Sequence, residues 1–332
     1  MSYKIGVPRS LAYYTFFPLW NTFFEELGFE VLVSKESNKA VLDEGVIDTV
    51  NDACVPIKLY HGHVKELADK VDYLFIPRLV SLDGKETTCP KFLGLPDMVK
   101  HSIDNLPPMI DVRLDLRNGY FELWRFFKKI GESLQKPTRQ ILAAYIKSLN
   151  VHNKYKKLLE NNMNPDEALE VIKGKKQEDL IKPKENTGER AINIALIGYP
   201  YTIYDPYISV DLLNKIRKMG ANVFTVENIP YKQLLKQKKK FSKEMFWYYS
   251  NNTARACMHF LEKKIVDGVI HVTAFGCGPD AMVDKFMELE CKKEGNVPFM
   301  TIALDEHTGD GGISTRVEAF IDMLNWKRGL KK

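Results

Sequence analysis

The sequence predicts an α/β protein with two parallel-sheet domains that are related by an internal repeat and separated by a helical segment. Residues 4–33 and 193–226 carry the repeat. Each contains an apolar strand, a loop with proline and aromatic residues, an amphipathic helix, a glycine and a second strand. A strand–helix–strand unit of this length is typical of a right-handed parallel crossover. We therefore expect two sheets with the same local connection.

A glycine ends the predicted helix at the same place in both repeats. Pro8 precedes Gly28 by 20 residues, and Pro200 precedes Gly220 by 20 residues. Glycine readily adopts the left-handed conformation that often follows the last helical turn. The equal spacing favours two copies of one unit, and we predict two Rossmann-like domains.

Each repeat continues with short apolar runs that we predict to be further strands. Residues 72–77 and 267–275 are rich in β-branched and aromatic side chains, as expected for strands buried on both faces of a parallel sheet. Residues 297–305 predict one more strand, and residues 109–113 are its expected counterpart. Helices are expected over residues 56–70, 206–219, 242–264, 279–292 and 314–326.

The region between the repeats is predicted to be helical. Apolar side chains recur at helical spacing over residues 120–134 and 138–160. A third helix is expected between Asn164, a typical N-cap residue, and Gly174. Residues 175–190 are polar and contain proline and glycine, which predicts a linker. The expected organisation is an N-terminal α/β domain (1–113), a helical segment with linker (114–190) and a C-terminal α/β domain (191–332).

Composition limits the classes of function. The 332 residues are 45% hydrophobic and 27% charged, which is the profile of a soluble globular protein. No apolar run approaches the roughly 20 residues that span a bilayer, and the first residues lack the pattern of a secretory signal. We predict a cytoplasmic protein without membrane contact. The lysine-rich residues 231–243 are interpreted as a solvated surface, so no nucleic acid is expected as a partner.

Three of the five cysteines lie where the chain is expected to change direction. Cys54, Cys89 and Cys277 each have a proline or glycine within two residues and fall between an apolar run and a predicted helix. Ligands of open parallel sheets bind beyond the carboxyl ends of the strands, and Cys89 and Cys277 follow counterpart strands of the repeat. We predict that the three thiols bind one metal centre in a cleft. The residues alone leave open a role as small buried core side chains.

The residues around Cys277 suit a bound group. Gly276 and Gly278 let the backbone approach such a group closely, and the next proline is typical of a first helical turn. A helix N-terminus stabilises negative charge and lowers the pKa of a thiol. Because prolines also follow Cys54 and Cys89, we expect all three thiols to ionise readily.

The other potential ligands are weaker candidates. Cys257 and Cys291 interrupt no helical pattern and are expected to be buried core side chains. His61 or His63 could supply a further ligand near Cys54. Two positions apart on one helix they cannot face the same way, so ordinary polar roles are favoured.

A second group of polar residues follows the last predicted strand. Glu306 and His307 are candidates for acid–base catalysis. Gly309 and Gly311 precede a predicted helix and could bind an anion with their backbone N–H groups. The alternative is a tight loop held by its own side-chain hydrogen bonds.

Six motifs in this order resemble a known family, the stand-alone acyl-CoA dehydratase activase-related proteins. These belong to the wider superfamily of 2-hydroxyacyl-CoA dehydratases and benzoyl-CoA reductases. The motifs are KIGVPRSL (4–11), CVPIKLYHGHV (54–64), DYLFIPR (72–78), CPKFLGLPD (89–97), GCGPD (276–280) and DEHTGDGGISTRVEAF (305–320). The resemblance covers most of the chain and is weakest over residues 114–190.

The resemblance implies a 4Fe-4S cluster held by three cysteines, which map onto Cys54, Cys89 and Cys277. Three thiolates leave one iron of such a cluster open. The resemblance also implies a partner, an ATP-dependent activase that delivers a low-potential electron. The electron would serve reductive or radical chemistry on a small or acyl-CoA-like substrate. Since the chain has no GxxxxGK[ST] loop, ATP is expected on that partner. A homodimer is also compatible with the family.

Two other hypotheses remain open at this point. The chain could be a non-catalytic electron relay that docks the activase, because no sequence feature is assigned to CoA. It could also be a zinc-stabilised binding protein that uses the same thiols.

Overall fold

A computed structural model describes residues 2–180, 191–241, 243, 245–295 and 297–329. The chain forms two compact units. Unit 1 comprises Met1–Lys157 and Met245–Tyr248, and unit 2 comprises Leu158–Glu244 and Tyr249–Lys332. Most of the predicted linker, residues 181–190, lies outside the described residues, as do residues 242 and 244 of the helix predicted over 242–264.

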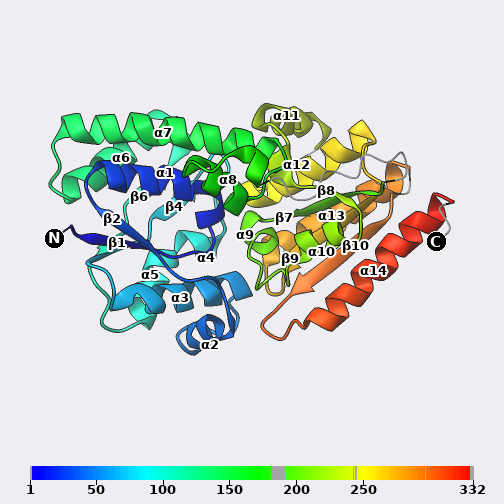
Figure 1. Ribbon diagram of the computed structural model, residues 1–332, viewed down its shortest axis with the longest axis horizontal. Helices are drawn as coiled ribbons and strands as arrows, with labels where there is room; N and C mark the ends of the chain where they lie inside the picture. The colour runs from blue at the N-terminus through cyan, green and yellow to red at the C-terminus, as the bar shows by residue number, and fades with distance from the viewer. Residues whose placement is uncertain (1, 181–190, 242, 244, 296, 330–332) are drawn as a thin grey trace. The chain divides into compact units, whose positions relative to one another are not determined.

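Unit 1 contains a four-stranded parallel sheet of β1 (Lys4–Val7), β2 (Glu30–Val33), β3 (Tyr73–Phe75) and β5 (Met109–Ile110). The strand order is β2-β1-β3-β5. A separate parallel pair joins β4 (Arg78–Ser81) to β6 (Arg113–Asp115). In Figure 1, α1 and α7 lie on one side of the four-stranded sheet and α3 on the other.

The helices of unit 1 follow from its apolar patterns. α1 ends at Glu26, and Gly28 then adopts a φ of 83°, which confirms the predicted glycine stop. The helix predicted over 56–70 is α3, which begins one residue earlier. The helices are α1 (Tyr13–Glu26), α2 (Lys39–Ile47), α3 (Val55–Ala68), α4 (Pro90–Leu93), α5 (Leu95–Ser102), α6 (Phe121–Ser133) and α7 (Thr138–Glu160), with a 3-10 turn η1 (Leu116–Asn118).

The core of unit 1 is rich in aromatic side chains. The ring centroids of Trp20 and Phe75 lie 5.1 Å apart, and those of Phe24 and Phe75 lie 5.0 Å apart. Phe23 packs on Phe127 at 4.6 Å, which joins α1 to α6. These contacts tie the sheet to the predicted helical region and so fix the frame on which the loops at the strand ends are held.

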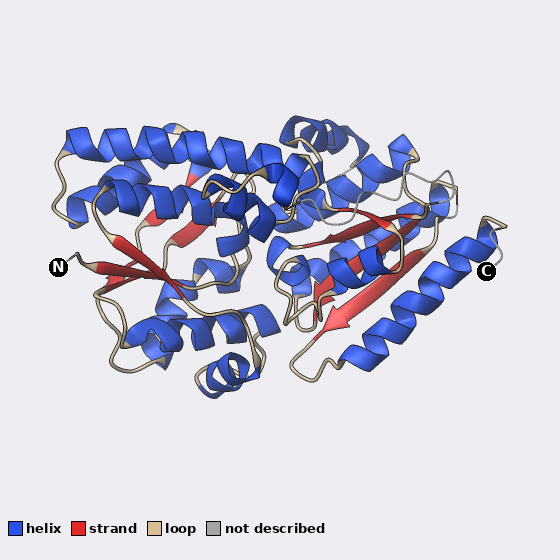
Figure 2. Cartoon of the chain, viewed as in Figure 1, coloured by secondary structure: helices blue, strands red, loops and turns tan. Residues whose placement is uncertain are grey.

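Unit 2 contains a second four-stranded parallel sheet of β7 (Asn193–Gly198), β8 (Asn222–Phe224), β9 (Gly268–Ala274) and β10 (Phe299–Leu304). Its order, β8-β7-β9-β10, repeats that of unit 1 element for element. All seven residues of β9 are buried, as predicted for a strand covered on both faces. The predicted α/β class with two repeated, Rossmann-like parallel sheets is therefore confirmed (Figure 2).

Most helices of unit 2 also match the sequence pattern. The predicted N-cap role of Asn164 is confirmed, because Asn164 and Glu167 exchange hydrogen bonds in a capping box at the start of α8. The helices are α8 (Pro165–Ile172), α9 (Pro200–Ile203), α10 (Leu212–Lys218), α11 (Tyr231–Lys236), α12 (Tyr248–Lys263), α13 (Gly278–Lys293) and α14 (Asp310–Lys327), with 3-10 turns η2 (Gln177–Asp179), η3 (Val226–Asn228) and η4 (Gln237–Lys240).

The helix predicted over 206–219 was too long. Only its second half is helical, because the Asp205 carboxylate accepts the N–H groups of Tyr207 and Ile208 and holds a turn there. Val210 and Asp211 then adopt φ values of 49° and 54°, which no continuous α-helix allows. In the part of the chain that the structure describes, no helix is long and apolar enough to cross a membrane.

Candidate functional site

The three candidate thiols share one local geometry. Cys54 is the N-cap residue of α3, Cys89 that of α4 and Cys277 that of α13. The φ and ψ angles are −68° and 152° for Cys54, −68° and 159° for Cys89, and −88° and 93° for Cys277. A proline lies in the first turn of each helix, where its missing N–H has no helical partner to lose. All three residues are partly buried.

A tight turn precedes Cys277. After β9 ends at Ala274, Gly276 adopts a φ of 76°, and the N–H of Cys277 donates to the carbonyl of Ala274 at 3.0 Å. A side chain at position 276 would be strained in this conformation. Gly278, by contrast, begins α13 with open space where a Cβ would stand. Only Gly276 is therefore required by the backbone itself.

Within unit 1, the structure brings Cys54 and Cys89 together. The two thiols are within electrostatic range, because a charge on Cys89 raises the pKa of Cys54. The Lys91 ammonium lies near both and lowers the pKa of each. Lys91 is itself held by the backbone carbonyl of Asp52, to which it donates a hydrogen bond. Two thiols and a fixed positive charge thus share the region where α3 and α4 begin.

The expectation that Cys54 and Cys89 ionise readily was wrong for the metal-free chain. Burial raises the pKa of both thiols above its ordinary value. The first-turn N–H groups, those of Ile57 for Cys54 and of Phe92 for Cys89, oppose this without outweighing it. The helix N-terminus does lower the pKa of each thiol, as expected, but the desolvation that comes with burial raises it by more. A bound cation would supply the positive charge that stabilises the thiolate form of both residues.

Cys277 lies in unit 2 and is described there by itself. Within the described residues, no group of three or more His, Cys, Asp or Glu side chains is placed to hold a metal ion. The predicted ligand set of Cys54, Cys89 and Cys277 therefore stays a prediction.

The remaining two cysteines are core side chains, as predicted. Cys257 and Cys291 are fully buried, and their sulfur atoms lie 3.9 Å apart in contact between α12 and α13. The mutual contact and then burial hold the pKa of Cys257 well above its usual range. Both are free thiols, and both lie inside helices rather than at helix starts.

The two histidines after Cys54 face different surroundings. His61 Nδ1 lies 2.8 Å from the carbonyl of Ile57, and His63 Nε2 lies 2.9 Å from the Ser37 hydroxyl. Both side chains are buried, and burial lowers both pKa values, that of His63 to about 4. These contacts agree with the polar structural roles that the sequence favoured.

The loop between β10 and α14 is held by its own side chains. The Asp305 carboxylate accepts the N–H of His307 at 2.9 Å and the hydroxyl of Thr308 at 2.9 Å. The N–H of Asp305 donates back to Thr308 Oγ1 at 2.7 Å. Gly309 is the N-cap residue of α14, and Gly311 lies in its first turn, with open space where each Cβ would stand. This is the self-bonded tight loop left open as the alternative, with the His307 side chain exposed beside it.

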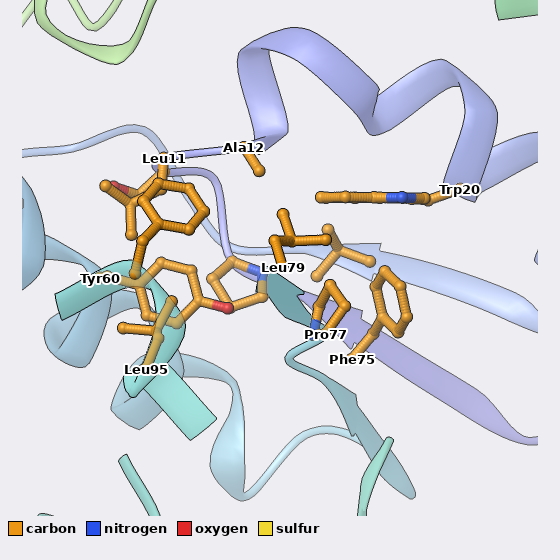
Figure 3. A pocket seen from close by; sticks show the side chains of 12 residues that line it. Leu11, Ala12, Trp20, Tyr60, Phe75, Pro77, Leu79 and Leu95 are labelled. Atoms are coloured by element: carbon orange, nitrogen blue, oxygen red, sulfur yellow. The ribbon is translucent and has the colours of Figure 1, made fainter. Parts of the chain in front are cut away.

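An apolar cavity lies at the carboxyl ends of β1 and β3 (Figure 3). Leu11, Tyr60, Phe75, Pro77 and Leu95 are among its walls, and the Tyr60 side chain points inward from α3. The space open to the centre of a water molecule is about 10 Å³, which is room for one water at most. The cavity is too small for an acyl group. It marks where α3, α4 and α5 pack around the loop that follows β1.

Comparison with known families decides the identity. A family described as CoA enzyme activase uncharacterised domain (DUF2229) matches residues 4–229, and a family described as 2-hydroxyglutaryl-CoA dehydratase, D-component, matches residues 159–324. The chain belongs to the acyl-CoA dehydratase and activase-related family. No match was found among curated proteins. The resemblance predicted from the six motifs is confirmed.

The candidate thiols of this activase-related protein fall in different matched regions. The match to the activase domain contains Cys54 and Cys89, and the match to the dehydratase component contains Cys277. The dehydratase match also contains the loop with Glu306 and His307. Every residue predicted to carry function therefore lies within a matched region.

Sequence reasoning missed one polar cluster of this family member. His271 lies in the middle of β9 and faces Asp280 and Asp284 on α13. A single histidine in an otherwise apolar strand was the signal that could have found it, because a buried polar side chain needs partners. Asp280 and Asp284, one helical turn apart, could then have been proposed as those partners.

Proposed function

We propose that this activase-related protein binds a 4Fe-4S cluster through Cys54, Cys89 and Cys277. It would accept a low-potential electron from an ATP-dependent activase, for reductive or radical chemistry on a small or acyl-CoA-like substrate. The observation that carries the proposal is the shared geometry of the three thiols, each the N-cap residue of a helix with proline in its first turn.

The residues present fit such a cluster in their chemistry. Thiolates are the ligands that iron–sulfur clusters use. First-turn N–H groups and the Lys91 ammonium act on Cys54 and Cys89 in the direction that favours thiolate. Because burial works against ionisation in the metal-free chain, cluster binding has to displace protons from these thiols. When bound, a cluster with one open iron would supply a one-electron carrier and a position for a substrate oxygen.

The chain's own residues would assist in two ways. His307 and Glu306 are proposed as acid–base groups, since the exposed His307 side chain stands in a loop beyond the carboxyl end of β10. Gly276, Gly278, Gly309 and Gly311 are proposed to leave backbone room for bound groups. The open space beside Gly278, Gly309 and Gly311 is consistent with this.

Anaerobic reconstitution with iron and sulfide tests the proposal. We expect about four irons per chain and loss of most of the bound iron in C54S, C89S and C277S. C291S is the matched control, because this thiol is fully buried beside Cys257 and should leave the iron content unchanged. Full iron content in all three variants would refute the ligand assignment.

The same preparation separates the alternatives. Zinc instead of iron in anaerobically purified protein would favour a zinc-stabilised binding protein. Iron loading without activase- and ATP-dependent turnover of acyl-CoAs would favour an electron relay.

A further inference from the structure

In unit 2 a buried histidine lies between two carboxylates of α13, the helix whose N-cap residue is Cys277. His271 is fully buried at the centre of β9, between Ile197 of β7 and Thr301 of β10. Its ring faces α13, which packs on β9 and β10 (Figure 1). A polar side chain in the central strand of a buried sheet is costly unless partners compensate for its loss of water.

Both ring nitrogens of His271 face carboxylate oxygens. Nδ1 lies 2.7 Å from Asp284 Oδ1, and Nε2 lies 3.3 Å from Asp280 Oδ1. The first contact is a hydrogen bond, and the second is an ion-pair distance without hydrogen-bond geometry. Ionised carboxylates only accept, and a neutral imidazole has one N–H. A ring that meets a carboxylate on each side therefore matches the doubly protonated imidazolium.

Asp280 depends on this contact more than Asp284 does. The Asp284 Oδ1 atom also accepts the hydroxyl of Thr301 at 2.6 Å and lies at a partly exposed residue. Asp280 is fully buried, and within the described residues neither of its carboxylate oxygens has a hydrogen-bond partner. Its charge is balanced by the His271 ring and by its place in the first turn of α13.

The position of Asp280 connects this cluster to a candidate functional residue. Asp280 lies three residues after Cys277, the N-cap residue of α13. Asp284 lies one turn further on the same helix, so the two carboxylates fasten the first two turns to β9. Gly276 in the turn before α13 and Gly278 at its first position leave this part of the chain little stiffness of its own. The position of the Cys277 thiol therefore depends on what holds the helix start.

We propose that His271 is a positioning residue: its imidazolium, bound between Asp280 and Asp284, holds the N-terminus of α13 on β9 and thereby fixes the Cys277 thiol. This inference concerns the metal-free chain and does not depend on the proposed cluster. Removal of one charge from such a buried pair leaves the other uncompensated, which strongly destabilises the local structure.

The surrounding groups agree with a charged ring. Burial lowers the pKa of His271, but Asp280 and then Asp284 outweigh it and raise that pKa to about 9. Burial likewise raises the pKa of Asp284, while His271 and Thr301 lower it. From β10 the Phe299 ring stacks on the imidazole at 6.4 Å between centroids, and Glu288 acts on Asp284 from the next turn of α13.

Alkylation of the native, metal-free protein tests the positioning role. Iodoacetamide labelling followed by mass spectrometry reports the rate at each cysteine separately. H271F keeps a ring of similar size. In this variant we expect the labelling rate of Cys277 to rise by about tenfold, because loss of a buried charge partner opens the helix start. The rates at Cys54 and Cys89 in the same molecules should stay unchanged.

Two variants of Asp284 provide a second measurement if H271F fails to fold. D284N removes the charge at nearly constant volume and should alter Cys277 labelling, whereas D284E keeps the carboxylate and should restore most of the wild-type rate. Equal changes at all three cysteines would show a global loss of structure and would overturn the proposal. So would an unchanged rate at Cys277.

The protonation state has its own test. In ¹⁵N-labelled protein at about pH 7.5, both ring nitrogens of His271 should give the chemical shifts of an imidazolium. A neutral ring at that pH would overturn the proposed charge, whatever the cluster content of the protein.

Discussion

The two units present a thiol in the same way and support it differently. In both, a cysteine that comes after the third strand of the four-stranded sheet is the N-cap residue of a helix. It is Cys89 in unit 1, where the further strand β4 intervenes, and Cys277 in unit 2. Unit 1 adds a second thiol, Cys54, and the Lys91 ammonium. Unit 2 instead adds a buried ionic triad behind the helix.

The difference shows which parts of the repeat are general and which are specialised. The sheet order and the cysteine at a helix N-cap recur, so they belong to the shared frame. The helices that precede the third strand carry their cysteines differently. Cys54 is the N-cap residue of α3, whereas the corresponding α12 contains the fully buried Cys257. Among the described residues, the two copies of one fold therefore differ in the number of cysteines at helix N-caps, with two in unit 1 and one in unit 2.

The largest expected effect tests how tightly α3 is held in unit 1. A Cβ on Gly62 would lie 1.8 Å from the carbonyl oxygen of Val41 on α2, and a Cβ on Gly45 would lie 1.8 Å from that of Lys58 on α3. Backbone atoms cannot change rotamer to make room. We expect G62A to lower the free energy of unfolding by about 3 kcal/mol or more, measured by urea denaturation.

G278A is the matched control at the helix start of unit 2, where no atom lies within 4 Å of an added Cβ. Its effect should stay within about 0.5 kcal/mol. Similar destabilisation by both variants would mean that α3 and α13 are held alike, which would contradict the difference between the two units.

The second prediction is that the two units lose stability at opposite ends of the pH range. His63 in unit 1 is neutral when buried, with a pKa lowered to about 4, whereas the pKa of His271 in unit 2 is raised to about 9. A lowered histidine pKa gives stability that is present above about pH 6.5 and lost as pH falls towards 4. A raised one gives stability that is present below about pH 6.5 and lost as pH rises through 9. Each is worth up to about 3 kcal/mol.

Hydrogen exchange resolved by segment, at about pH 5, 7 and 9 and corrected for intrinsic rates, measures both the loss of stability in acid and the loss in base. Acid should weaken protection of α3 first, and base should weaken that of β9 and α13 first. H63Q should reduce the loss of protection in acid, and H271F should reduce the loss of protection in base. The same pH response in both units would contradict the opposite charge states of the two histidines.

The smallest expected effect concerns the thiol pair of unit 1. Lys91 lowers the pKa of both Cys54 and Cys89, so K91Q should raise both and slow their alkylation near pH 8 by about threefold. K91R, which keeps the charge, should retain most of the wild-type rate. Cys277 serves as the internal reference and should not respond. A loss of rate at all three thiols would point to a general structural change instead.

Much of the fold could be predicted from the sequence because its signals are local. Equal spacing from Pro8 to Gly28 and from Pro200 to Gly220 revealed the repeat, and the left-handed φ of 83° at both glycines explains that spacing. Apolar runs predicted the central strands because both faces of a parallel sheet are covered. The overlong helix over 206–219 failed because the Asp205 turn depends on one side chain binding backbone N–H groups two and three residues later.

The candidate site was predictable in its residues and less so in its chemistry. Proline or glycine next to Cys54, Cys89 and Cys277 predicted thiols at chain turns, and each is an N-cap residue. The ease of ionisation was predicted wrongly for Cys54 and Cys89, because burial depends on packing that no short motif encodes.

The class of fold, the repeat, the family and the position of each thiol at a helix start could be predicted from the sequence, because they depend on short-range pattern and backbone preference. Tertiary structure alone decided three things. It placed Cys54 within electrostatic range of Cys89, with Lys91 in range of both, it paired Cys257 with Cys291, and it placed His271 between Asp280 and Asp284. Charge, burial and contact between residues far apart in the chain arise only when helices and strands pack, and they set what each side chain can do.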